Sequence, residues 1–282
     1  MAIRSAKRIL QTMMCIRKKA AAALAAGLCL TSPSAAQGVD QLVQLDILDG
    51  GRTAKGTYQG ALRLTLKDGW KTYWRAPGDA GIPPQFNWAG SGNVGDIKII
   101  WPAPSVFDQN GLQSIGYADQ LVLPVEITPK NPAKPVRLRG EMDLGVCKDV
   151  CVPGRLGFDH TLDSQAGRNP AIAAALAQRP FSAREAGVAE TECRLKPTDD
   201  GMQIEAHIKM PSAGGAEIAV IEPGNPMLWA SQADTTRQGS TLIARSEVIS
   251  ATGGPFALDR SEVRITVLGA DHAVDIIGCT AG

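Results

Sequence analysis

Residues 58–66 read YQGALRLTL, and this stretch has the alternation of an antiparallel strand. Leu62, Leu64 and Leu66 share one face of such a strand, and Arg63 and Thr65 share the other. Turn residues separate this segment from similar ones at intervals of about eight to fifteen residues, a spacing typical of an antiparallel β-sandwich. The other expected strands of this half are 41–48, 70–75, 86–88, 96–101, 120–128, 136–147 and 156–162.

The pattern breaks at residues 169–178, NPAIAAALAQ, where Asn169 can cap a helix that starts at Pro170. Strands are expected to resume at 190–196, 202–210, 216–222, 241–249, 262–268 and 272–279. We therefore predict an all-β protein of two immunoglobulin-like antiparallel β-sandwich domains joined by a short helical linker. The predicted boundaries are 38–165 for the first domain, 166–186 for the linker and 187–282 for the second domain.

The first 36 residues have the three parts of a secretory signal peptide. An apolar run of 11 residues, 20–30, follows a basic head without acids, and Ser34 and Ala36 are small residues before a cleavage point. The run is shorter than the roughly 20 residues that span a bilayer. The basic head contains Arg4, Lys7, Arg8, Arg17, Lys18 and Lys19. Cleavage would leave 23 cations against 28 acids, so the exported, soluble protein would carry a net charge of −5.

Several function classes have no residues to support them. The sequence contains no HExxH, no paired Cys-x-x-Cys zinc pattern, no phosphate-binding glycine loop and no Gly-x-Ser-x-Gly elbow. Hydrolase, kinase and dehydrogenase functions are therefore not predicted, and neither is a cofactor. No lysine and arginine cluster follows the basic head, so no nucleic-acid partner is expected.

Four cysteines remain after cleavage, and an even number in an exported chain indicates disulfides. Spacing favours one bond between Cys147 and Cys151 and another between Cys193 and Cys279. The second bond would close a long loop, and we predict a structural role for it.

The segment Cys147-Lys148-Asp149-Val150-Cys151 leaves three functions open: redox exchange, a structural bond, and metal binding. A disulfide that closes a small ring stabilises a fold little and is easier to exchange when accessible. Lys148 favours a thiolate and Asp149 opposes it. Met142 could complete a copper(I) site with the two cysteines, although a plain strand position explains it better.

An ordered series of motifs over about residues 60–155 resembles a known family. The motifs are 67–75 (KDGWKTYWR), 77–83 (PGDAGIP), 101–104 (WPAP), 116–117 (GY), 121–125 (LVLPV) and 146–153 (VCKDVCVP). Together they resemble the periplasmic N-terminal domain of DsbD-type protein-disulfide reductases, with the ScsB-like branch, linked to suppression of copper sensitivity, as the most similar. The second half resembles that branch only in position and general character.

The resemblance implies an immunoglobulin-like domain whose cysteine pair passes electrons between a membrane-embedded donor and periplasmic thioredoxin-like partners. Cys147 and Cys151 would be the redox pair, with Lys148 and Asp149 between them. Trp70 and Tyr73 would lie beside them on a neighbouring strand, and residues 104–117, with Phe107 and Tyr117, would form a loop covering the disulfide.

The sequence shows no membrane domain and no thioredoxin domain, so the electron donor is expected to be another protein. The resemblance favours a protein-disulfide reductase component over the alternative, a periplasmic copper(I)-binding or copper-tolerance protein that uses the same cysteines. A structural protein held by two disulfides is the third possibility.

Overall fold

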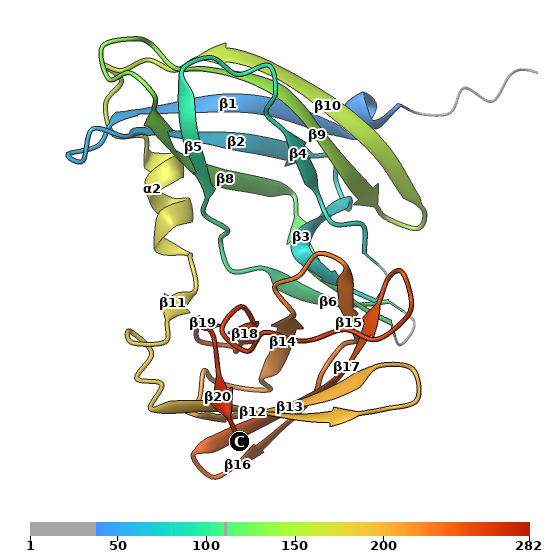
Figure 1. The fold of residues 1–282 in the computed structure, drawn as a ribbon. Coiled ribbons are helices and arrows are strands. Elements are labelled where there is room, and N and C mark those ends of the chain that lie inside the picture. The colour runs from blue at the N-terminus through green and yellow to red at the C-terminus, as the bar shows by residue number, and fades with distance from the viewer. Residues whose placement is uncertain (1–37, 80, 110–111) are drawn as a thin grey trace, which may run out of the picture. The chain divides into compact units, whose positions relative to one another are not determined.

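The computed structural model describes residues 38–79, 81–109 and 112–282, and Figure 1 shows its ribbon. Residues Gly38–Gly282 group into one unit by their contacts. Strands dominate this part of the chain, together with a short 3-10 helix, η1 (Val39–Gln41), and an α-helix, α2 (Pro170–Ala177). No helix among the described residues is both long and apolar enough to cross a membrane. The predicted signal peptide lies outside the described residues.

Two sheets form the first sandwich. One has the order β1-β2-β8-β5, made of Val43–Arg52, Tyr58–Leu66, Gln120–Pro129 and Val94–Ile99. The other has the order β10-β9-β3-β7-β6, made of Cys151–Thr161, Arg137–Cys147, Lys71–Gly78, Leu112–Ala118 and Ser105–Gln109, with β4 (Gln85–Asn87) paired to β9. All pairings in these two sheets are antiparallel.

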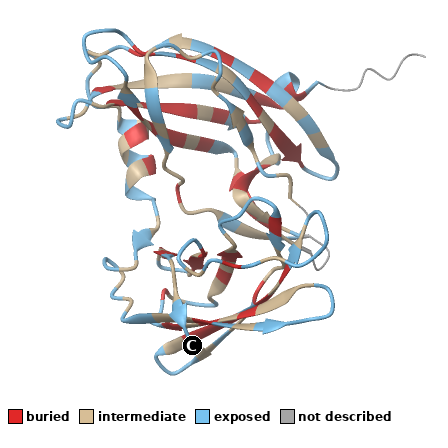
Figure 2. Cartoon of the chain, viewed as in Figure 1, coloured by how far each residue is buried: buried red, intermediate tan, exposed pale blue. Residues whose placement is uncertain are grey.

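The core of the first sandwich follows from the alternation seen in the sequence. Leu62 and Leu64 of β2 are fully buried, and Trp74 of β3 packs into the same cluster from the other sheet. Figure 2 shows buried and exposed residues alternating along the strands of this sandwich. Burial of one face of each sheet fixes the register, because a shift of one residue would turn the apolar side chains toward water.

The second sandwich also has two sheets. One has the order β11-β19-β18-β14, made of Phe181–Ser182, Ala273–Ile277, Arg264–Leu268 and Ile218–Glu222. The other has the order β15-β17-β13-β12-β20, made of Leu228–Ala230, Thr241–Ser250, Met202–Lys209, Glu190–Pro197 and Thr280–Ala281, with β16 (Asp234–Gln238) paired to β17. Only β11–β19 and β12–β20 pair in parallel among the described strands.

Helix α2 lies between the two sandwiches in the chain, and its start is the one that the sequence predicts. The Asn169 side chain accepts hydrogen bonds from the backbone N–H groups of Ala171 (3.0 Å) and Ile172 (3.4 Å), and Pro170 occupies the first helical position. Ile172 and Ala175 are buried and α2 packs against β8. The predicted fold class is confirmed, while the domain boundaries at 165 and 187 stay a prediction.

Residues 104–117 were expected to be a loop, and this is wrong. They form most of the antiparallel pair β6–β7, with Val106 opposite Ile115 and Phe107 opposite Ser114. The sequence held a signal for this, because Asn110-Gly111 is a favoured hairpin dipeptide between two alternating segments. Trp70 is also misplaced by the prediction: β3 begins at Lys71, one residue later.

Candidate active site

The Cys147–Cys151 disulfide closes the end of the β9–β10 hairpin. Cys147 is the last residue of β9 and Cys151 is the first of β10, and the two face each other in the ladder with 4.1 Å between their α-carbons. The Lys148 N–H donates to the Val150 carbonyl at 3.2 Å and so tightens the three-residue connection. An unbroken antiparallel register from Cys151↔Cys147 to Thr161↔Arg137 supports the disulfide at the tip.

The two cysteines differ in exposure. Cys147 is 2% exposed, whereas Cys151 is exposed to solvent, as is the preceding Val150, which is 66% exposed. An attacking thiolate has to approach one sulfur along the axis of the S–S bond, so access decides which sulfur it reaches. Of the two cysteines, Cys151 is therefore the more accessible and Cys147 the more enclosed.

Tyr73 of β3 contacts both sulfurs. Its hydroxyl oxygen lies 2.8 Å from Cys147 Sγ and 3.3 Å from Cys151 Sγ. A disulfide sulfur carries no proton, so the tyrosine hydroxyl is the donor to either one. Burial raises the pKa of Tyr73 above its usual value of 10.0, and the hydroxyl therefore keeps its proton throughout the neutral range.

Local packing holds the Tyr73 ring in place. Gly81 lies so close that a β-carbon added there would come within 2.8 Å of Tyr73 Cδ1 and within 2.2 Å of Pro77 Cβ. The same loop continues into Ile82, whose side chain covers Gly145 of β9. A residue without a side chain at position 81 is thus needed for the loop to lie flat on the tyrosine.

Trp70 does not share this position. Its backbone N–H donates to Lys67 O at 2.9 Å in the turn before β3, and its side chain packs, half-buried, against the core of the first sandwich. The neighbouring Lys71 is the residue opposite Cys147 in the ladder, and its Nζ lies 4.4 Å from the centre of the Phe107 ring. Lys71 thus links Phe107 of β6 to the edge of the disulfide, a contact that sequence reasoning missed.

Tyr117 lies near the cysteines in the ladder but on the other face of the sheet. It is opposite Thr72, which is in turn opposite Val146, and Tyr117 and Val146 belong to the core. Its buried hydroxyl donates to Pro102 O at 2.8 Å, and burial raises its pKa. Tyr117 therefore anchors β7 from the core side, whereas neighbouring Cys147 points to the opposite face.

The two charged residues of the connection lie in solvent. Lys148 Nζ is 3.4 Å from the carbonyl oxygen of Asp68, and both Lys148 and Asp149 are exposed. The lysine side chain also runs over Gly69, where a β-carbon would meet its terminal atoms at 3.0 Å. This contact ties the disulfide connection to the turn that precedes β3.

Met142 does not approach the cysteines. It is fully buried in the core, opposite Leu156, and five residues before Cys147 on the regular strand β9. Side chains an odd number of residues apart on a strand point to opposite faces. Within the described ranges, no three His, Cys, Asp or Glu side chains gather in a way that would hold a metal ion.

Cys193 and Cys279 also form a disulfide, which joins β12 to the segment between β19 and β20. Their α-carbons are 5.7 Å apart and 86 residues separate them in the sequence. Cys193 is fully buried in the core of the second sandwich, and its carbonyl accepts a hydrogen bond from Arg260 Nε at 3.0 Å. Its burial makes it a poor target for exchange.

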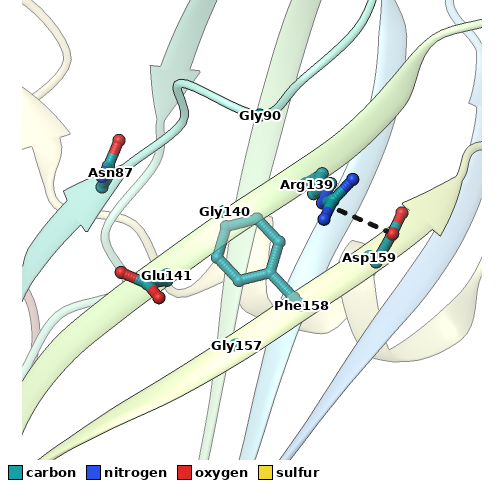
Figure 3. Close-up of a pocket in the computed structure, with 8 residues that line it drawn as sticks. All are labelled: Asn87, Gly90, Arg139, Gly140, Glu141, Gly157, Phe158 and Asp159. Carbon is teal, nitrogen blue, oxygen red and sulfur yellow. Dashed lines mark ion pairs between the residues drawn. The ribbon is translucent and has the colours of Figure 1, made fainter.

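A shallow hollow on the β9–β10 hairpin is unrelated to the disulfide (Figure 3). Glu141 and Gly157, which line it, face each other six ladder positions from the cysteines, or roughly 20 Å along the strands. Its Arg139 and Asp159 form an exposed ion pair at 3.7 Å. The charged side chains of this hollow largely pair with their neighbours on the adjacent strand. We therefore regard the hollow as ordinary solvent-exposed surface and not as a binding site.

Comparison with known proteins places this geometry in context. Residues 40–161 match the family model described as thiol:disulfide interchange protein DsbD, N-terminal. Among solved structures, the N-terminal periplasmic domain of ScsB from Proteus mirabilis has the same fold, with a TM-score of 0.66 and 20% sequence identity. That match covers 88% of this chain and 97% of the other. A comparison with curated proteins found no match. The family resemblance predicted from the sequence is thus confirmed.

Proposed function

We propose that this chain, whose residues 40–161 match the DsbD N-terminal family model, is a periplasmic thiol–disulfide exchange module whose redox pair is Cys147 and Cys151. One observation carries the proposal: a disulfide at a hairpin tip joins one exposed cysteine to one buried cysteine, and a tyrosine hydroxyl contacts both sulfurs. A bond with only a structural role needs neither an accessible sulfur nor a donor aimed at it.

We infer the order of the steps from the different exposure of the two cysteines. A partner thiolate attacks Cys151 Sγ, the Cys147–Cys151 bond breaks, and the electron pair of that bond goes to Cys147 Sγ. Tyr73 donates to this new thiolate, which makes Cys147 a better leaving group. The partner's second thiolate then attacks the partner sulfur of the mixed disulfide and releases Cys151 as a thiolate. The partner leaves with its own disulfide formed, and this chain is reduced.

The onward step runs the same chemistry in reverse. The Cys151 thiolate attacks the disulfide of an acceptor, and Cys147 resolves the mixed disulfide, which returns the chain to its oxidised form and reduces the acceptor. By the family resemblance, we propose a membrane protein as the electron donor and thioredoxin-like periplasmic proteins as the acceptors.

Single-cysteine variants test this order. Cys147→Ala leaves the exposed Cys151 free, and we expect it to form mixed disulfides with a thioredoxin-like protein under non-reducing conditions. Cys151→Ala leaves only the buried Cys147 and should trap far less. The proposal is wrong if neither variant traps a partner, and the assigned order is wrong if Cys151→Ala traps more than Cys147→Ala.

A reduction potential gives a second, independent measurement. Potentials of exchange proteins lie between about −120 and −270 mV, whereas structural disulfides lie below about −300 mV. Titration of the Cys147–Cys151 bond should give a value in the first range. A potential in the second range would assign the bond a structural role only.

A further inference from the structure

Strand β3 is irregular directly after Tyr73. Tyr73 lies opposite Gly116 of β7, but the next paired residue on β3 is Gly78, opposite Ser114. Five steps along β3 thus match two along β7, and the pairing of β3 with β9 stops at Thr72. The bulge, residues 74–77, has no ladder partner in the described sheets. Bulges next to active sites re-aim side chains, so what fixes the bulge also affects Tyr73.

Arg75, within the bulge, is held by the second sandwich. Its Nε and Nη2 donate to the two carboxylate oxygens of Glu222 on β14 at 3.0 and 2.9 Å. Nη2 also donates to Thr266 Oγ1 at 3.1 Å and lies 3.7 Å from the carboxylate of Asp275. The guanidinium carbon lies 4.0 Å from the centre of the Trp74 ring, so the first sandwich holds its other face.

These contacts form a balanced and largely buried charge cluster. Arg264 completes it through two bonds of 2.7 Å to Asp275, which gives two cations and two carboxylates. The Arg75 side chain is only 13% exposed. Burial lowers its pKa below the usual value, and the negative charge of Glu222 offsets part of this effect. A buried charge that loses its partner is strongly unfavourable, so the cluster constrains the position of Arg75. Lysine cannot replace a bidentate arginine in this geometry.

The bulge touches Tyr73 through its last residue. Pro77 lies against Gly81, and Gly81 in turn lies against the Tyr73 ring. A second link joins the same region to the second sandwich, because the Gln232 side-chain amide donates to Gln113 Oε1, next to Ser114 of β7. The second sandwich therefore contacts β3, which carries the tyrosine, and its neighbour β7.

We propose that Arg75 is a positioning residue for the cysteine pair. By pairing with Glu222 and Asp275 of the second sandwich, it fixes the bulge of β3 and so holds the Tyr73 hydroxyl on the two sulfurs. This inference rests on the proposed exchange function and gives the second sandwich a role in it. Arg75 takes part in no bond that forms or breaks: the electron pair still moves from the S–S bond to Cys147.

The test is a double-mutant cycle in the full chain, with dithiothreitol as the probe dithiol. The rate of reduction of Cys147–Cys151 is measured in the unaltered chain, in Arg75→Lys, in Tyr73→Phe and in the double variant, with a melting temperature for each. We expect Arg75→Lys to slow reduction about threefold or more, and to have almost no further effect once Tyr73→Phe is present, since coupled residues are non-additive. Glu222→Gln should reproduce the result from the other side of the ion pair.

Arg137→Lys is the matched control. Arg137 also makes a bidentate pair, with Asp159 at 2.6 and 2.5 Å, but it lies at the first position of β9, at the opposite end of that strand from Cys147. The Cys147–Cys151 bond in Arg137→Lys should be reduced at the same rate as in the unaltered chain. The inference is overturned if Arg75→Lys and Glu222→Gln leave the rate unchanged, or slow it equally with and without Tyr73→Phe. If Cys147–Cys151 resists dithiothreitol until the protein unfolds, the proposed exchange function is wrong as well. Failure of that function is thus distinguishable from failure of the Arg75 inference alone.

Discussion

The Tyr73 hydroxyl lies 2.8 Å from the Cys147 sulfur and 3.3 Å from the Cys151 sulfur, so one side chain of β3 contacts both atoms of the Cys147–Cys151 bond. The shorter contact is to the buried Cys147, which is the leaving group in the exchange that we propose. In that proposal, the tyrosine stabilises the charge that develops on Cys147 during the reaction rather than the disulfide itself.

Tyr73→Phe should slow reduction of the disulfide with little change in the fold. A hydrogen bond to a charged group contributes about 1.5–3 kcal/mol, and loss of part of this in the transition state gives a fall of roughly tenfold in rate. Stopped-flow reduction measures the effect. An unchanged rate would rule out the role assigned to Tyr73.

The raised pKa of Tyr73 makes the stability of the folded protein depend on pH. Because burial raises the pKa above 10.0, the folded protein holds this proton more tightly than the unfolded chain does. The associated stability is complete below about pH 10 and is lost as the pH rises through the folded-state value. In denaturant unfolding, the unaltered chain should lose stability above pH 10 more steeply than Tyr73→Phe. Parallel pH profiles would contradict this.

Gly81→Ala should resemble Tyr73→Phe in exchange rate and also lower the stability. A β-carbon at this position would meet the Tyr73 ring at 2.8 Å and Pro77 Cβ at 2.2 Å, so the ring or the loop must move. Overpacking of this kind costs about 1–3 kcal/mol. Gly167→Ala is the control, since nothing lies within 4 Å of a β-carbon there. Equal rates and melting temperatures in the two variants would show that the loop does not position the tyrosine.

The two disulfides should differ in their effect on stability. Replacement of Cys193 and Cys279 together by alanine opens a loop with a sequence separation of 86 residues, for which the chain-entropy model gives about 4–5 kcal/mol. Replacement of Cys147 and Cys151 opens a ring with a separation of four, for which the same model gives about 2 kcal/mol. Urea unfolding measures both values. If removal of Cys147–Cys151 lowers the free energy of unfolding more than removal of Cys193–Cys279, the structural role assigned to Cys193–Cys279 is wrong.

Glu185 should contribute stability that disappears in acid. Its carboxylate accepts bonds from Arg179 at 2.6 and 2.9 Å and from the Ser182 N–H and hydroxyl at 2.8 Å, and these hold its pKa at about 2, below the usual 4.5. The stability is present above pH 4.5 and is lost as the pH falls through about 2. The difference in melting temperature between the unaltered chain and Glu185→Gln should therefore shrink from pH 5 to pH 2. A constant difference would exclude this linkage, and high salt should reduce the effect because the pair is exposed.

The sequence by itself determined the features that local patterns encode. Alternation predicted most of the strands, including 58–66 without error, and Asn169 followed by Pro170 predicted the start of the helix. The closely spaced Cys147 and Cys151, together with the motif series around them, predicted the resemblance to the family whose model residues 40–161 match. A period of two residues and a capping residue act over a few positions, so they can be read without knowledge of the fold.

Only the tertiary structure decided how the site is built. Which cysteine is exposed depends on what packs against the hairpin tip, and Tyr73 rather than Trp70 meets the sulfurs because β3 begins at Lys71 with Lys71 opposite Cys147. Arg75 and Glu222 are 147 residues apart, and no local pattern relates them. Register, bulges and contacts between distant strands are set by the burial of the whole core, which no segment of the sequence specifies alone.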